Sequence, residues 1–93
     1  MDFKIIVEKV REKYGEIDKK SGHLFLLSVL FEEIGELAEA VRKQDVNKIA
    51  EELADSLFML ISLANYFDVD PIPILVSKFI EKDVSSEWDL PSS

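Results

Sequence analysis

The stretch FEEIGELAEAVRK, residues 31–43, places acidic side chains among apolar ones in a pattern typical of an α-helix. At helical spacing, Glu33 shares one stripe with the apolar residues Leu26, Leu30, Leu37 and Ala40. Such a stripe normally faces the protein core, where an ionised carboxylate is costly unless it is paired. We therefore expect an inward-facing Glu33 to need a partner that neutralises it.

Composition narrows the class of protein. The 93 residues fit one small domain with a thin core, and without cysteine no disulfide can stabilise this core. The net charge of −8 argues against nucleic-acid binding, which normally needs a basic stripe. Met1 is followed by Asp2 rather than by a signal sequence, and no apolar run approaches the roughly 20 residues that span a bilayer. We expect a cytoplasmic protein that binds neither nucleic acid nor membrane.

Helical periodicity predicts an all-α fold of about four helices in one domain, residues 1–84, followed by a polar tail, residues 85–93. Asp2, Asp45 and Asp70 are placed to cap helix starts. Between the first two helices lies a polar connector, residues 15–22, whose structure the sequence leaves open, although Ile17 is able to extend the first helix. The expected helices cover residues 3–14, 24–43, 46–67 and 71–82.

The segment SLFMLISLANYF, residues 56–67, is apolar almost all the way round. A helix of this kind is buried on most sides, and three short helices from the same chain would hardly cover it. We therefore expect a homo-oligomer, either a homodimer or a homotetramer, with this helix near the centre of the interface.

Two acidic pairs recur at matching spacing on the second and third expected helices. Glu33 and Glu36 form one i, i+3 pair, and Glu52 and Asp55 form the other. Since the connection near residues 44–45 is short, the two helices should pack as an antiparallel hairpin. The two pairs lie at similar distances from this turn, so we expect all four carboxylates to converge.

Four converging carboxylates need compensation. Two bare charges about 4 Å apart repel by about 4 kcal/mol at an effective dielectric constant of about 20. Either protonation or a divalent cation relieves this repulsion. A set of oxygen ligands without cysteine or histidine favours Mg²⁺, with Mn²⁺ as the other choice, over zinc.

The competing interpretation is that these acids are solvated or paired with lysines. Glu39 with Lys43 has the favourable order and spacing, so we assign that pair to the surface. There is no base four residues after Glu33, Glu52 or Asp55. Lys48 precedes Glu52 by four residues, which is the weaker order for an ion pair. The repeated spacing therefore favours the metal site.

The two acidic motifs also carry a family resemblance. EEIGE, residues 32–36, followed after a spacer by ELAD, residues 52–55, resembles the EExxE and ExxD signature of MazG-type nucleoside triphosphate pyrophosphohydrolases, part of the all-α NTP pyrophosphatase group. The resemblance extends over about residues 22–83, including the apolar run after ELAD and the helix start at Asp70 and Pro71.

This resemblance implies a helical bundle that dimerises or forms a dimer of dimers. It implies Mg²⁺-dependent hydrolysis of nucleoside triphosphates, canonical or modified, between the α- and β-phosphates, which gives a monophosphate and pyrophosphate. Glu32, the first acid of EExxE, either orients or activates the attacking water or supports the site. Four residues match the metal ligands of the family: Glu33, Glu36, Glu52 and Asp55.

Basic residues of the last helix contact phosphates in this family, and Lys78 and Lys82 are the matching candidates here. The family often has an arginine at the end of this helix, whereas the only arginines of this chain are Arg11 and Arg42. Both lysines are equally well explained as solvated side chains. The missing arginine keeps an alternative open, in which the chain is a MazG-like module that binds a metal or nucleotide with little turnover.

Three further residues allow two interpretations each. His23 is either a polar residue in the first turn of its helix or a contact to nucleotide. Asn65 is either a buried structural amide or a group that reaches the nucleotide. Trp88, in the tail, either docks on a neighbouring subunit or stays in solvent.

Overall fold

The computed structural model describes residues 1–83, which form four α-helices and no strand. The predicted all-α class is confirmed for this part of the chain. The tail with Trp88 lies outside the described residues. The helices are α1 (Phe3–Ser21), α2 (His23–Lys43), α3 (Val46–Phe67) and α4 (Ile72–Phe79).

Aspartates start three of the four helices, as their positions in the sequence predict. The Asp2 side chain accepts a hydrogen bond from the Ile5 backbone N–H at 3.0 Å, and Asp45 accepts one from Lys48 at 3.2 Å. Asp70 accepts from the Ile72 N–H at 3.0 Å, although the cap position itself is Pro71. Each of these bonds satisfies a backbone donor that the helix leaves open.

Two predicted boundaries are wrong. The first helix does not end near residue 14, because Gly15 stays helical and α1 continues to Ser21. A glycine within a helix costs only about 1 kcal/mol, and the following residues are good helix formers that include the Glu16–Lys20 ion pair. The last helix ends at Phe79, so Lys82 lies beyond it rather than on the same helical face as Lys78.

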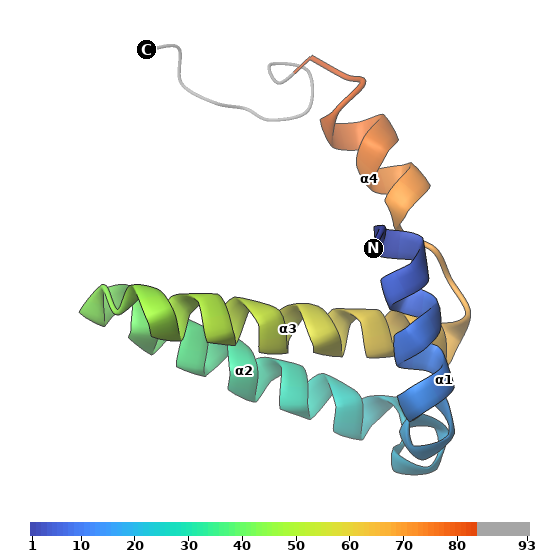
Figure 1. Cartoon of the computed structure of the whole chain (residues 1–93), viewed down its shortest axis with the longest axis horizontal. Helices are drawn as coiled ribbons and strands as arrows, with labels where there is room; N and C mark the ends of the chain where they lie inside the picture. The colour runs from blue at the N-terminus through green and yellow to red at the C-terminus, as the bar shows by residue number, and fades with distance from the viewer. Residues whose placement is uncertain (84–93) are drawn as a thin grey trace.

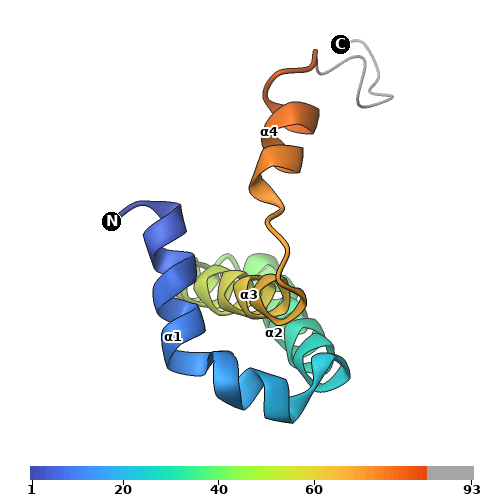
Figure 2. The ribbon, with the colours of Figure 1, turned by 90° about the vertical axis from the view of Figure 1, so that its right-hand side faces the viewer.

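The helices pack around the seam between α2 and α3. These two lie side by side and are joined by Gln44 and Asp45 alone, while α1 packs across the C-terminal part of α3 (Figure 1). The small core consists of Leu26, Leu30 and Met59, with partly buried neighbours from the same two helices. In contrast, α4 points away from the other helices (Figure 2), and none of its Cα atoms lies within 8 Å of a Cα atom of another helix.

One face of α3 remains uncovered in the single chain. Leu53, Leu57 and Leu60 recur at helical spacing and are each about half exposed, with 52%, 48% and 51% of their surface accessible. As the sequence analysis predicts, the other helices of one chain do not cover α3 on all sides. No single helix of residues 1–83 is long and apolar enough to cross a membrane; α3 and α4 together have the length and composition, but the chain bends by 117° between them.

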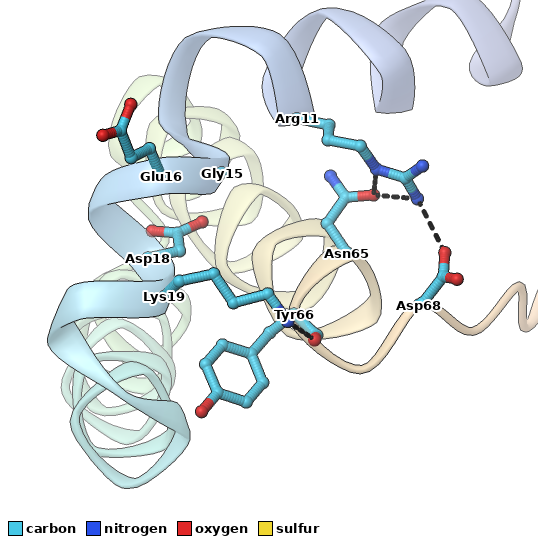
Figure 3. A pocket seen from close by; sticks show the side chains of 8 residues that line it. All are labelled: Arg11, Gly15, Glu16, Asp18, Lys19, Asn65, Tyr66 and Asp68. Carbon is cyan, nitrogen blue, oxygen red and sulfur yellow. Dashed lines mark hydrogen bonds and ion pairs between the residues drawn. The ribbon is translucent and has the colours of Figure 1, made fainter.

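A polar contact fixes α1 against α3. The buried amide of Asn65 accepts hydrogen bonds from the Arg11 guanidinium at 3.2 and 3.0 Å (Figure 3). The same amide donates a hydrogen bond to the Val7 carbonyl at 3.2 Å. Arg11 also reaches the exposed Asp68 at 3.5 Å. These contacts agree with the interpretation of Asn65 as a structural amide.

Replacement of Asn65 by leucine should destabilise the fold, because it leaves the Val7 carbonyl and the Arg11 guanidinium without their partner. We expect a loss of about 1–3 kcal/mol in the free energy of unfolding, measured by urea denaturation followed by circular dichroism. Asp68→Asn is the matched control: it removes an exposed ion pair and should change stability by less than about 1 kcal/mol. Equal effects of the two substitutions would contradict this account of the α1–α3 contact.

Candidate metal centre

Carboxylates from α2 and α3 meet at the seam between the two helices. Glu33 and Glu36 project from successive turns of α2, and Glu52 projects from α3 toward them. One oxygen from each of these three residues lies within 4.8 Å of the others. A second group of the same tightness joins Glu52 to its α3 neighbours Glu51 and Asp55. Glu52 is therefore the residue common to both groups.

Glu52 is almost completely buried, with 1% of its surface exposed. Its Oε1 atom forms an ion pair with Lys48 Nζ at 3.2 Å, and the same ammonium lies 3.7 Å from Glu51 Oε2. The sequence analysis ranked Lys48 as a weak partner because it precedes Glu52 by four residues. The structure shows that this lysine neutralises part of the acidic cluster.

Two other carboxylate oxygens at the seam lack partners. Oε2 of Glu52 and Oε2 of Glu33 are both buried, and neither has a hydrogen-bond partner among the described residues. A buried acceptor without a partner costs about 1–3 kcal/mol, and more when it is charged. Hard divalent cations prefer such oxygen ligands, so the residues present fit Mg²⁺ or Mn²⁺.

The electrostatics of the cluster favour one bound proton when no cation is present. A hydrogen bond with Glu52 is the largest cause that raises the pKa of Glu33 to about 7, and burial and the charges of Glu36, Glu52 and Asp55 add to it. The charge of Glu52 is the main cause that raises the pKa of Glu36. The proton therefore resides on the α2 side of the seam.

The pKa of Glu52 moves in the other direction. Burial alone would raise the pKa of Glu52, but hydrogen bonds from Glu33, Lys48 and Glu36 outweigh burial and lower it. The hydrogen bond to Glu52 is in turn the main cause that raises the pKa of Lys48. Glu52 is thus the carboxylate that stays ionised, because its neighbours donate to it.

The other predicted site residues lie at different distances from this cluster. Asp55 is partly buried and belongs to the group with Glu51 and Glu52 rather than to the group of Glu33 and Glu36. Glu32 is exposed and belongs to neither carboxylate group. Lys78 is on α4, whose Cα atoms all lie more than 8 Å from the Cα atoms of the other helices of residues 1–83, and Lys82 lies beyond its end. The described chain does not bring these two lysines to the carboxylates.

A cavity of about 300 Å³ adjoins the cluster near the turn between α2 and α3. Glu36 and Glu39 line it together with Lys43 and Lys48, so it combines acidic and basic groups. A larger cavity of about 480 Å³ lies between α1 and the end of α3, around Arg11, Asp18 and Asn65 (Figure 3). Asn65 comes 13 residues after Glu52, or about 20 Å along the helix, so this cavity is separate from the carboxylates.

The sequence analysis did not assign Lys48 and Glu51 to the site. Their spacing to Glu52 contained the signal, since residues three and four apart share a helical face. His23, in the first turn of α2, is exposed, and its Nδ1 atom lies 3.5 Å from the Tyr66 hydroxyl.

The metal-free protein should lose stability as the pH rises from 4.5 to 7. In this window the folded state binds more protons than the unfolded state, because the pKa of Glu33 is raised from 4.5 to about 7 and that of Glu36 is raised as well. The lowered pKa of Glu52 acts only at lower pH, where its contribution is lost as the pH falls below the ordinary value of 4.5.

Melting temperatures measured in EDTA and in MgCl₂ across this pH range test the expectation. Mg²⁺ should raise the melting temperature above pH 7 and have little effect near pH 4.5. Glu33→Gln should flatten the pH dependence in EDTA and remove the response to Mg²⁺. The exposed-pair variant Glu39→Gln should behave like the wild type. A melting temperature that changes neither on addition of Mg²⁺ nor on substitution of Glu33 by glutamine would contradict the assignment of a metal centre.

Comparison with known families gave one match. The family model of the MazG nucleotide pyrophosphohydrolase domain matches residues 21–83, about two thirds of the chain, and this range contains every carboxylate of the cluster between α2 and α3. Comparison with curated proteins and with solved structures gave no significant match.

Proposed function

Since the chain belongs to the MazG family of nucleotide pyrophosphohydrolases, we propose that it hydrolyses nucleoside or deoxynucleoside triphosphates to a monophosphate and pyrophosphate. The substrates include triphosphates with canonical or modified bases. The observation that carries the proposal is the buried carboxylate cluster between α2 and α3, in which two oxygens have no partner among the described residues.

Glu33, Glu36, Glu52 and Asp55 are the proposed ligands of Mg²⁺, or alternatively Mn²⁺. A bound divalent cation offsets the charge of a triphosphate and polarises its phosphoryl oxygens. Lys48 supports the same centre by neutralising Glu52 from the side that faces the turn. The arrangement lets an acidic protein bind a strongly acidic substrate.

Glu32 is the proposed partner of the attacking water. It is exposed on α2 directly before the ligand Glu33, so its carboxylate is not occupied by the buried cluster. In this role Glu32 orients the water or accepts its proton, which is general-base catalysis. If Glu32 instead supports the site, a different group orients the attacking water.

The proposed phosphate contacts come from lysines. Lys43 and Lys48 line the cavity next to Glu36, which makes this cavity the candidate position for part of the triphosphate. Lys78 and Lys82 are further proposed contacts. In the single chain they are not close to the carboxylates, so their participation requires α4 to meet the cluster in an assembly.

We also propose that the antiparallel pair of α2 and α3 is completed by homo-oligomerisation, as a dimer or tetramer. The half-exposed leucines of α3 support this, because soluble monomers rarely leave so much contiguous apolar surface uncovered. The missing terminal arginine favours an alternative, in which the chain binds a metal or nucleotide with little turnover.

Pyrophosphate release tests the proposed reaction. We expect release from at least one triphosphate in a panel of canonical and modified NTPs and dNTPs with Mg²⁺, together with equimolar monophosphate identified by mass spectrometry. EDTA should abolish the reaction. Release of orthophosphate would indicate cleavage at a different phosphate bond. Nucleotide binding without product would favour the binding module.

Glu52→Gln should abolish turnover, because the substitution removes the negative charge shared by both carboxylate groups. Loss of a residue that only supports a metal ligand reduces activity by up to roughly 100-fold. Loss of the ligand itself should reduce activity by at least as much. Circular dichroism should show an intact helical fold, since the amide has the same size. Glu16→Gln, which removes an exposed carboxylate and its ion pair with Lys20 on α1, should retain activity within a few-fold. Full activity of Glu52→Gln would remove the site assignment.

A further inference from the structure

The hydroxyl group of Ser56, on α3, is buried and has no hydrogen-bond partner among the described residues. A serine in a helix often donates to a backbone carbonyl of the preceding turn, as Ser21 and Ser28 do in this chain at 2.9 and 2.7 Å. Ser56 does not form such a bond, and an unpaired buried hydroxyl lowers stability. Its hydroxyl is therefore available to a group outside its own helix.

Ser56 lies at the same level of the α2–α3 pair as Glu33. Glu33 precedes the turn at residues 44–45 by 11 residues, and Ser56 follows that turn by the same number. Equal counts place two residues side by side in an antiparallel hairpin. The next layer obeys the same rule, because Leu30 and Met59 are each 14 residues from the turn and both belong to the buried core cluster.

The layer of Glu33 and Ser56 contains one unused donor and one unused acceptor. Ser56 follows Glu52 by four residues, so it shares the helical face that Glu52 turns toward α2. The Oε2 atom of Glu33 is buried without a partner among residues 1–83, as is the Ser56 hydroxyl. A serine hydroxyl donates a hydrogen bond that a carboxylate oxygen accepts, so each of the two groups supplies what the other lacks.

From this juxtaposition we propose that Ser56 is a positioning residue of the metal centre, whose hydroxyl donates a hydrogen bond to the carboxylate of Glu33 and holds it in the orientation that binds the cation. Carboxylate ligands of metals are generally held by such outer hydrogen bonds. The structure does not contain this bond, and a change of rotamer in either side chain forms it. The proposal rests on the metal centre of the proposed function, but it does not require turnover.

Ser62 provides a matched control on the same helix. Its side chain is completely buried, with 0% of its surface exposed, and its hydroxyl likewise has no partner among the described residues. Ser62 lies six residues beyond Ser56, or about 9 Å along α3, on the other side of Met59 from the carboxylates. The two serines therefore share burial and an unpaired hydroxyl, but only Ser56 adjoins the acidic cluster.

Titration with Mn²⁺ in the absence of nucleotide tests the role of Ser56 without any activity measurement, with the free ion followed by electron paramagnetic resonance. Ser56→Ala should weaken Mn²⁺ binding by about 10–100-fold, which is the usual effect of losing a residue that supports a metal ligand. Ser62→Ala should bind Mn²⁺ like the wild type. Unchanged binding by Ser56→Ala, or an equal loss in both variants, would overturn the inference.

Urea denaturation in EDTA shows whether a loss of affinity comes from a damaged fold. Both alanine variants should be at least as stable as the wild type, because each loses an unpaired buried hydroxyl and alanine favours the helix. Ser56→Thr keeps the hydroxyl but adds a methyl group at a position with 5% of its surface exposed. This variant should therefore be less stable, yet bind Mn²⁺ within a few-fold of the wild type.

Affinity and stability should thus change in opposite directions in Ser56→Ala and Ser56→Thr, which a purely structural role of Ser56 does not produce. A threonine variant that binds Mn²⁺ as weakly as the alanine variant would contradict the role of the hydroxyl. Wild-type protein that binds Mn²⁺ but releases no pyrophosphate would refute the proposed reaction and leave the role of Ser56 standing on the binding data. Wild-type protein that does not bind Mn²⁺ would refute the metal centre and this inference with it.

Discussion

Carboxylate repulsion at the seam between α2 and α3 is the constraint on which the rest of the structure depends. The same two helices must bury leucines to form the core and bring acids within 4.8 Å of each other. Glu52 is subject to both requirements, because its side chain is buried and its lowered pKa keeps it ionised. One lysine and the neighbouring carboxyl groups compensate for part of this burial. A divalent cation completes the compensation in the proposed enzyme, so catalysis uses a charge that folding alone would avoid.

The seam also explains why the acids and the apolar residues alternate along the chain. Two of the inward acids are followed directly by an exposed apolar residue: Ile34 follows Glu33, and Leu53 follows Glu52. The helix thereby presents a polar seam and an apolar surface only about 100° apart. An assembly that covers the apolar surface fixes the position of α3, and with it the carboxylates. The proposed oligomerisation and the proposed metal binding thus rest on one sequence pattern.

The sequence predicted the two central helices closely because their signals agree. Strong periodicity, the cap at Asp45 and the two-residue turn all point to the same boundaries, and the convergence of Glu33, Glu36 and Glu52 follows from counting away from that turn. The extent of α1 was not predictable from Gly15, because a single glycine either ends a helix or sits within one, and packing against α3 decides. The pairing of Lys48 with Glu52 depends on burial, which spacing alone does not reveal. The position of α4 could not be predicted either, since no other helix of residues 1–83 has a Cα atom within 8 Å of it to fix its direction.

The junction between α1 and α2 has almost no length. Gly22 alone separates the two helices, with φ of 89° and ψ of 155°, a backbone conformation that is essentially restricted to glycine. No atom lies within 4 Å of where a β-carbon would be, so backbone geometry, rather than space, reserves this position for glycine. With no linker to absorb a change, the angle at this one residue sets the course of α1. A substitution here would change the direction of the whole first helix. The Arg11 guanidinium, more than two helical turns from the altered residue, would then move away from α3.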